Sequence, residues 1–462
     1  MNNKERYKRI LMFISAFILI AVFAQAYSFV WNDYYNSDML DPFWHNGNIL
    51  MICIYIVFYV FFTKTFNGFK IGYLKWPGLW GSQILGILAT NVVVFVQISL
   101  IGRGRLSVIP MLALSGIEIL LAGVWSILFT KLFTKIYPPR RMIIVYGNVN
   151  AKDLVQKMSN RPDKYMICAA ISCNEDIELI KSRILEYEAV ILSDVPNGTR
   201  NKLIKFTLEN SIRTYINPKL SDIIIRGAED FHLFDTPLLL SRNDGLPFEQ
   251  AGAKRLFDIV FSAIALTILS PVLLITALII KCYDRGPVFY SQERLTKDGK
   301  IFKVHKFRSM IVNAEKDGVA RLASQKDDRI TPIGKFIRKV RIDELPQLIN
   351  ILRGDMSFVG PRPERPQLAE KYTESMPEFG YRLKVKAGLT GYAQVMGKYN
   401  TTPYDKLKLD LMYIERQSLL LDMKIILMTI KTCFVPEATE GVAEHQPLET
   451  HREEHDDEKV LN

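Results

Sequence analysis

The sequence predicts an α/β membrane protein in three parts: a four-helix transmembrane unit, a small Rossmann-like parallel α/β domain, and a C-terminal domain with a re-entrant membrane helix. Three observations support this. Four long apolar stretches lie in the first 136 residues, short apolar strands alternate with helical segments over residues 142–234, and the charge-free run 259–280 is broken by Ser270-Pro271. We expect these parts at residues 1–136, 142–240 and 251–436, followed by an acidic, disordered tail at 437–462.

The first part contains four stretches that match the roughly 20 apolar residues needed to cross a bilayer. Basic residues precede the first stretch and follow the fourth, whereas the first intervening loop carries Asp33, Asp38 and Asp41 and no Lys or Arg. By the positive-inside rule, both ends of the unit face the cytoplasm. The stretches are residues 10–31, 47–63, 78–102 and 106–130.

Glu118 lies inside the fourth stretch. A carboxylate at membrane depth marks either a functional site or a helix-packing contact, and we favour packing.

The second part alternates strands with helices, which is typical of a parallel sheet. A dinucleotide site needs several glycines after the first strand, so that the backbone can approach a pyrophosphate. Here only Gly147 follows that strand, so a structural or regulatory module is favoured over a nucleotide-binding domain. The expected strands are 142–146, 165–171, 189–192 and 214–216, and a linker is expected at 241–250.

The third part begins with the 22-residue run 259–280. Proline removes a backbone hydrogen bond and bends a helix, which makes Ser270-Pro271 the expected break. Lys254 and Arg255 precede the run and Lys281 and Arg285 follow it, so both ends prefer the cytoplasm. A helix that enters one leaflet and returns satisfies both observations. The alternative, a kinked complete span, would place the rest of the chain outside the cell.

The net charge is +11, and the tail from residue 437 contributes −7, so the remainder carries +18. Such an excess suits anionic partners such as lipid headgroups, phosphates or nucleic acid, although flanking of membrane spans explains part of it. The 5 cysteines have no paired spacing, which argues against a disulfide framework or a zinc site.

The densest group of chemically active residue types lies between residues 302 and 390, where basic side chains frame the adjacent carboxylates Asp343 and Glu344. This pattern suits phosphoryl chemistry, because cations neutralise substrate phosphates, one carboxylate can act as a nucleophile and another can bind a divalent metal. Prolines on both sides of Arg362 fix its backbone. The basic residues include Lys303, Lys306 and Arg308, then Arg338, Lys339 and Arg341, then Arg362 in Gly360-Pro-Arg-Pro363.

From about residue 254 to 430 the chain resembles the bacterial sugar transferase family, the monotopic polyprenyl-phosphate phosphoglycosyl transferases. With its four spans and α/β domain it is similar to the long form, such as undecaprenyl-phosphate galactose or glucose phosphotransferases. The matching motifs include Lys306-Phe-Arg-Ser-Met310, Asp343-Glu-Leu-Pro-Gln-Leu-Ile-Asn350, Gly354-Asp-Met-Ser-Phe-Val-Gly-Pro-Arg-Pro363, Ala387-Gly-Leu-Thr-Gly-Tyr-Ala-Gln394 and Leu409-Asp410.

The resemblance implies an enzyme in the bacterial cytoplasmic membrane with its catalytic domain on the cytoplasmic face. Asp343 would attack a UDP-sugar, release UMP and pass the phosphosugar to undecaprenyl phosphate, initiating exopolysaccharide or capsule synthesis. Glu344 would help bind Mg²⁺, and Asp410 would support the site. The basic residues Lys306, Arg308, Arg338 and Arg362 would contact phosphates or the nucleotide. Membrane lipid is an expected partner, nucleic acid is not, and a homo-oligomer stays open.

Ala387, Tyr392 and Met396 stand where the family usually has proline, often tryptophan and often asparagine, which leaves the sugar open. Two other function classes remain alternatives. One is a membrane-anchored scaffold for polysaccharide assembly, and the intact Asp343-Glu344 pair argues against it. The other is a nucleotide-sugar dehydratase or epimerase, and the missing glycines argue against that.

Overall fold

The computed structural model describes residues 7–102, 106–147, 151–241, 245–312, 327, 329–397 and 401–433. The acidic tail expected at 437–462 lies outside the described residues. The chain forms two compact units, which divide between Asn217 and Pro218.

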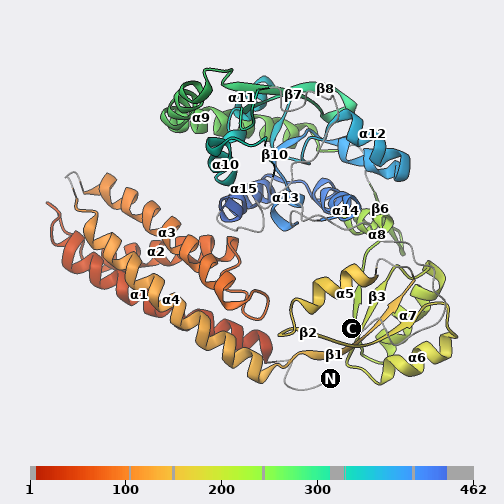
Figure 1. Ribbon diagram of the computed structural model, residues 1–462. Coiled ribbons are helices and arrows are strands. Elements are labelled where there is room, and N and C mark those ends of the chain that lie inside the picture. Colours follow the sequence, from red (N-terminus) through yellow and green to blue (C-terminus); the bar gives the residue numbers. More distant parts are fainter. Residues whose placement is uncertain are drawn as a thin grey trace. The chain divides into compact units, whose positions relative to one another are not determined.

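The first unit opens with apolar helices, as the sequence predicts (Figure 1). Each is long and apolar enough to cross a membrane, counting α1 together with the π-helical turn η2 (Trp31–Asn36) that continues it. Their buried side chains, among them Phe23, Tyr59 and Leu79, form one hydrophobic cluster. The helices are α1 (Lys8–Val30), α2 (His45–Thr65), α3 (Trp76–Ile101) and α4 (Ile109–Ile136).

Glu118 is fully buried between these helices. Its carboxylate accepts hydrogen bonds from Tyr55 of α2 at 2.5 Å and from Asn91 of α3 at 2.8 Å. A buried polar group must find partners inside the bundle, and here the partners join three helices. This geometry suits the helix-packing interpretation.

The rest of the first unit is a parallel four-stranded sheet in the order β2-β1-β3-β4. Figure 1 shows α5 (Ala151–Ser159) on one side of the sheet and α6 (Ile177–Leu185) and α7 (Asn197–Glu209) on the other. Alternate β1 residues face the two sides, Ile144 toward α5 and Ile143 toward α6 and α7, so the expected parallel α/β domain is confirmed. The strands are β1 (Arg140–Tyr146), β2 (Tyr165–Ser172), β3 (Ala189–Ser193) and β4 (Arg213–Ile216).

Gly147, at the end of β1, has a packing role that needs no nucleotide. A Cβ atom at this position would lie 2.1 Å from the carbonyl oxygen of Asp194, which follows β3. Any larger residue would therefore push the two loops apart.

The second unit begins with α8 (Leu220–Gly227) and the antiparallel hairpin β5 (Glu229–Leu233) and β6 (Thr236–Leu240). The sequence placed the end of the α/β domain at residue 240, whereas Ile223 of α8 packs against Leu407 and Leu411 of α14 (Pro403–Ile414). The amphipathic face of α8 is thus buried in the second unit, which moves the division to residue 217.

The helix α9 (Phe248–Asp284) contains Ser270 and Pro271 within a single 37-residue element. Both of its halves contact other elements of the second unit. Asp258 accepts a hydrogen bond from the Phe358 amide at 2.9 Å, and Asp284 forms an ion pair with Arg308. Between these ends the apolar side chains are largely exposed, with Ile268 at 70%.

The remaining elements surround the antiparallel hairpin β7 (Phe289–Leu295) and β8 (Ile301–Phe307) and the parallel pair β9 (Ser357–Val359) and β10 (Gly388–Thr390). Phe302, Leu348 and Met356 form a core that also receives Leu266 of α9. The other elements are η3 (Lys297–Gly299), α10 (Pro332–Lys339), η4 (Ile342–Glu344), α11 (Gln347–Arg353), α12 (Pro366–Ser375), η5 (Pro377–Lys384), α13 (Tyr392–Met396) and α15 (Leu419–Cys433).

Candidate functional site

Asp343 and Glu344 lie on η4, a single 3₁₀ turn between α10 and α11. The chain reverses at Arg341, which has a left-handed backbone with φ +60°. This reversal carries the two carboxylates inward, and each residue is only 9% exposed. Two adjacent buried acids are costly unless cations lie nearby, so their surroundings define the site.

Glu344 is held by two cations that share one of its oxygens. Lys306 Nζ from β8 lies 3.0 Å from Oε1, and Arg362 Nη2 lies 2.6 Å from the same atom. Burial alone would raise the pKa of Glu344, but Arg362 and Lys306 outweigh it and hold this pKa well below its usual range. Glu344 is therefore ionised at neutral pH.

Asp343 has the opposite character. Within the part of the chain that the structure describes, its carboxylate makes no hydrogen bond or ion pair. Burial, together with the charge of Glu344, raises the pKa of Asp343 to about 6, against the opposing charges of Lys306, Arg338 and Arg362. Asp343 is thus an unpaired carboxylate that is still ionised at neutral pH and more basic than an ordinary aspartate. Those properties suit a nucleophile.

The structure brings together most, but not all, of the residues expected from the sequence. Arg338 lies in the last turn of α10, and its charge lowers the pKa of Asp343, as do the charges of Lys306 and Arg362. Arg308 is different: its side chain is buried and pairs with Asp284 at the end of α9 instead of joining the carboxylate pair.

Asp410 does not contact Asp343 or Glu344 directly among the described residues. It is buried on α14 and forms an ion pair with Arg382 of η5, with 2.8 Å between Oδ2 and Nη2. Burial raises the pKa of Asp410 to about 6, although Arg382 pulls it down. Among the described residues, Asp410 is therefore connected to the site through Arg382.

Sequence reasoning missed two arginines. Arg294 of β7 donates to the Pro363 carbonyl at 3.1 Å, and Arg382 donates to the Arg362 carbonyl at 3.0 Å. Both hold the backbone around Arg362, yet they lie 68 and 20 residues from it in the chain. The only available signal was the place of Arg382 a few residues before the motif Ala387-Gly-Leu-Thr-Gly-Tyr-Ala-Gln394.

A metal site made by the protein alone is absent from the described residues, since no three His, Cys, Asp or Glu side chains gather there. Asp343 and Glu344 nevertheless offer adjacent carboxylate oxygens. Mg²⁺ is usually held by one or two carboxylates with water and substrate phosphates completing its shell, so this donor set fits it.

Comparison with protein families gives a match to the bacterial sugar transferase model over residues 249–436. This range begins at α9 and contains every site residue described above.

Curated relatives also match part of the chain. The chain is 43% identical over 182 residues to a UDP-N-acetylgalactosamine-undecaprenyl-phosphate N-acetylgalactosaminephosphotransferase of Aeromonas hydrophila, covering 39% of this chain and 43% of the relative. It is 41% identical over 223 residues to a UDP-glucose:undecaprenyl-phosphate glucose-1-phosphate transferase of Escherichia coli K12, covering 46% and 45%. The chain thus spans less than half the length of these two relatives.

A relative from Caulobacter vibrioides, also named a UDP-glucose:undecaprenyl-phosphate glucose-1-phosphate transferase, is 38% identical over 200 residues. That alignment covers 42% of this chain and 74% of the relative.

Proposed function

The chain belongs to the bacterial sugar transferase family, and we propose that it moves a sugar-1-phosphate from a UDP-sugar to undecaprenyl phosphate. The observation that carries this proposal is the contrast within one buried pair. Glu344 is ionised and bound by Lys306 and Arg362, while Asp343 is unpaired and more basic. The named relatives act on UDP-sugars or undecaprenyl phosphate, which supports the same reactant classes here.

In the first half-reaction, an Asp343 carboxylate oxygen attacks the phosphorus that carries the sugar. The bond from this phosphorus to the bridging oxygen breaks, and UMP leaves with that oxygen. The product is an aspartyl-phosphosugar on the protein. Lys306, Arg338 and Arg362 offset the negative charge of the donor diphosphate, which would otherwise repel a carboxylate nucleophile.

In the second half-reaction, an oxygen of undecaprenyl phosphate attacks the same phosphorus and Asp343 leaves as a carboxylate. No proton needs to move in either step, because each nucleophile and each leaving group is an anion. The lipid product is a polyprenyl-diphospho-sugar, the form that begins exopolysaccharide or capsule synthesis.

Glu344, with Asp343 beside it, would hold Mg²⁺ together with the substrate phosphates. The ion supplies further neutralisation of phosphate charge. The described residues already supply the carboxylate oxygens that such an ion prefers.

The proposal places α9 in one leaflet of the membrane as a re-entrant helix. Asp258 and Asp284 are 26 residues apart, about 39 Å along a straight helix, which exceeds the ~30 Å hydrocarbon core. Yet both contact other residues of the second compact unit, namely Phe358 and Arg308. A bend at Ser270-Pro271 would let both ends stay on the cytoplasmic side, where UDP-sugars are found, with the exposed apolar middle in lipid.

The products distinguish this reaction from ordinary glycosyl transfer. Membranes containing the protein would be incubated with a panel of UDP-sugars, undecaprenyl phosphate and Mg²⁺, and the released nucleotide identified. We expect UMP with at least one sugar and none from Asp343→Asn, because an amide is a poor nucleophile. Release of UDP, or full activity in Asp343→Asn, would reject the proposal.

A further inference from the structure

The segment that carries Arg362, residues 361–364, is held by its carbonyl oxygens. Proline has no N–H, so two of the four residues cannot donate a backbone hydrogen bond. Every carbonyl in the segment accepts one instead, and two of the four donors are arginine side chains. The pairs are Pro361 with Gly388 N at 2.9 Å, Arg362 with Arg382 Nη2 at 3.0 Å, Pro363 with Arg294 Nη1 at 3.1 Å and Glu364 with Leu295 N at 3.0 Å.

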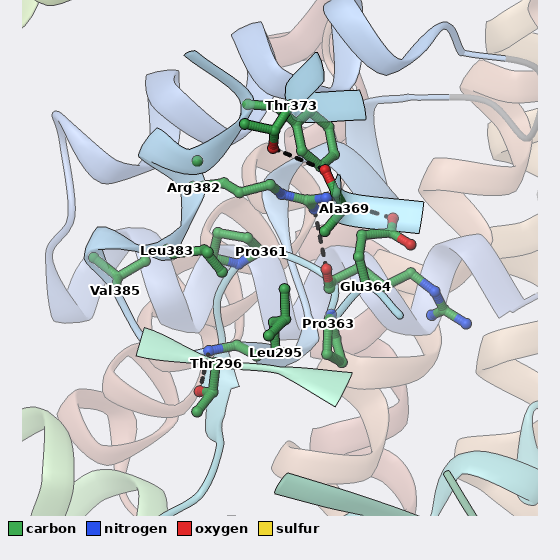
Figure 2. Close-up of a pocket in the computed structure, with 14 residues that line it drawn as sticks. Leu295, Thr296, Pro361, Pro363, Glu364, Ala369, Thr373, Arg382, Leu383 and Val385 are labelled. Carbon is green, nitrogen blue, oxygen red and sulfur yellow. Dashed lines mark hydrogen bonds and ion pairs between the residues drawn. The ribbon is translucent and has the colours of Figure 1, made fainter. Parts of the chain in front are cut away.

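Of the two arginines that bond this segment, Arg382 is the more deeply buried, with its side chain 5% exposed. Its guanidinium also forms ion pairs with Asp410 at 2.8 Å and with Glu364 at 3.4 Å, and it lies over the Phe379 ring. Figure 2 shows Arg382 and Glu364 in the wall of a pocket that the segment itself helps to line. Two carboxylates therefore balance its charge, so its contribution to the site is geometric more than electrostatic.

Arg362 depends on such support. Its side chain is 44% exposed. Among the described residues, its guanidinium forms a hydrogen bond and ion pair with Glu344 alone. A long, half-exposed side chain can reach one partner reliably only when its backbone is held in the right place. The hydrogen bond from Arg382 to the Arg362 carbonyl holds that backbone in place.

We infer that Arg382 is a positioning residue: it holds the Arg362 backbone so that the Arg362 guanidinium reaches Glu344 and the donor phosphates. This inference rests on the proposed function. Asp410 and Glu364 orient Arg382 in turn, which connects α14 to the reactive pair through two arginines.

A double-mutant cycle tests this route, because a residue that acts only through Arg362 has nothing to act on once that side chain is removed. Arg382→Gln would be made in the wild-type chain and in Arg362→Ala, and UMP release measured. We expect about a 10- to 100-fold fall in kcat in the first background, as for a misplaced catalytic group. In Arg362→Ala we expect a change of less than about 2-fold.

A separate control distinguishes a loss of stability from a loss of positioning. Arg382→Gln leaves the buried Asp410 without its partner, so Arg382→Gln with Asp410→Asn removes both charges together. The doubly substituted chain should melt closer to wild type than Arg382→Gln and should still lose kcat. Lys371→Gln on the exposed surface of α12 loses one positive charge and should leave kcat unchanged.

Rescue by a conservative variant gives a second readout. Arg382→Lys keeps a positive charge and a hydrogen-bond donor, so it should recover part of the kcat lost in Arg382→Gln.

Equal losses of kcat in the two backgrounds, with UMP released by wild type, would overturn the positioning role alone. No UMP release by wild type with any UDP-sugar would overturn the proposed function and this role with it.

Discussion

Arg362 Nη2 lies 2.6 Å from Glu344 Oε1, although the two residues are 18 positions apart. Lys306 reaches the same oxygen at 3.0 Å. This convergence gives the neighbouring carboxylates different tasks. Glu344 is neutralised and fixed, whereas both oxygens of Asp343 are without a partner among the residues that the structure describes.

The rate of the donor half-reaction should depend on the ionisation of Asp343. Its pKa is raised to about 6, and only the carboxylate attacks phosphorus. At lower pH the proton occupies the nucleophile, so UMP release should fall about tenfold per pH unit below 6 and level off above 7. Single-turnover UMP release across pH 5 to 8 measures this.

Glu344→Gln is the matched variant for that profile. Removing the neighbouring negative charge should lower the pKa of Asp343 and move the acid limb to lower pH. It should also lower the plateau rate about 100-fold, since one electrostatic contact to the reacting phosphates is lost. An unchanged limb would show that Asp343 is not the titrating group.

Asp343→Asn should abolish turnover and raise thermal stability. The folded protein binds a proton at Asp343 more tightly than the unfolded chain does, so stability falls as pH rises from about 4 to about 6. At neutral pH the ionised carboxylate costs on the order of 2 to 3 kcal/mol, which asparagine does not incur. Melting in detergent at pH 7.5 and at pH 4.5 checks the sign: the gain should shrink at the lower pH.

Lys254 anchors the start of α9 to α15 through a buried ion pair. Its Nζ lies 2.5 Å from Asp422 Oδ2 and also donates to the Val359 carbonyl at 3.2 Å. Lys254→Met leaves Asp422 buried without its cation and should destabilise the second unit by about 3 to 5 kcal/mol.

Lys254→Met combined with Asp422→Asn should recover most of that loss in a melting experiment. Equal melting of the single and double variants would show that the pair does not anchor α9.

The sequence predicted elements that local pattern determines. Runs of apolar residues placed α1 to α4, and short β-branched runs placed β1 to β4, because burial on a helix or a parallel strand leaves a pattern within one element. The pair Asp343 and Glu344 and the cations Lys306 and Arg362 stood out as a dense cluster of charged residues, to which the family motifs added roles, and the structure brings them together.

Contacts between distant segments were not predictable. Arg308 looks like Lys306 in sequence, but it pairs with Asp284 because its position beyond β8 brings it to the end of α9. The packing of α8 against α14 was not predictable either, because its ordinary amphipathic pattern does not say which core it joins. Arg382 has no local signal for its bond to the Arg362 carbonyl.

The two ends of α9 should lie on one side of the membrane. Cys282 is exposed near one end, and Gly252→Cys near the other meets no atom within 4 Å. In a chain whose other cysteines are serine, both thiols should react with an impermeant reagent in inverted vesicles and neither in intact spheroplasts. Labelling of the two positions from opposite sides would establish a complete span and contradict the cytoplasmic site.

The most direct test is to supply donor without lipid acceptor and look for the phosphosugar on the protein. With the UDP-sugar that supports UMP release, we expect about one UMP per protein molecule and a mass increase of one phosphosugar on the peptide containing Asp343. Addition of undecaprenyl phosphate should remove the label, and Asp343→Asn should never acquire it. UMP release that requires the lipid from the first turnover, with no label on the protein, would contradict the account.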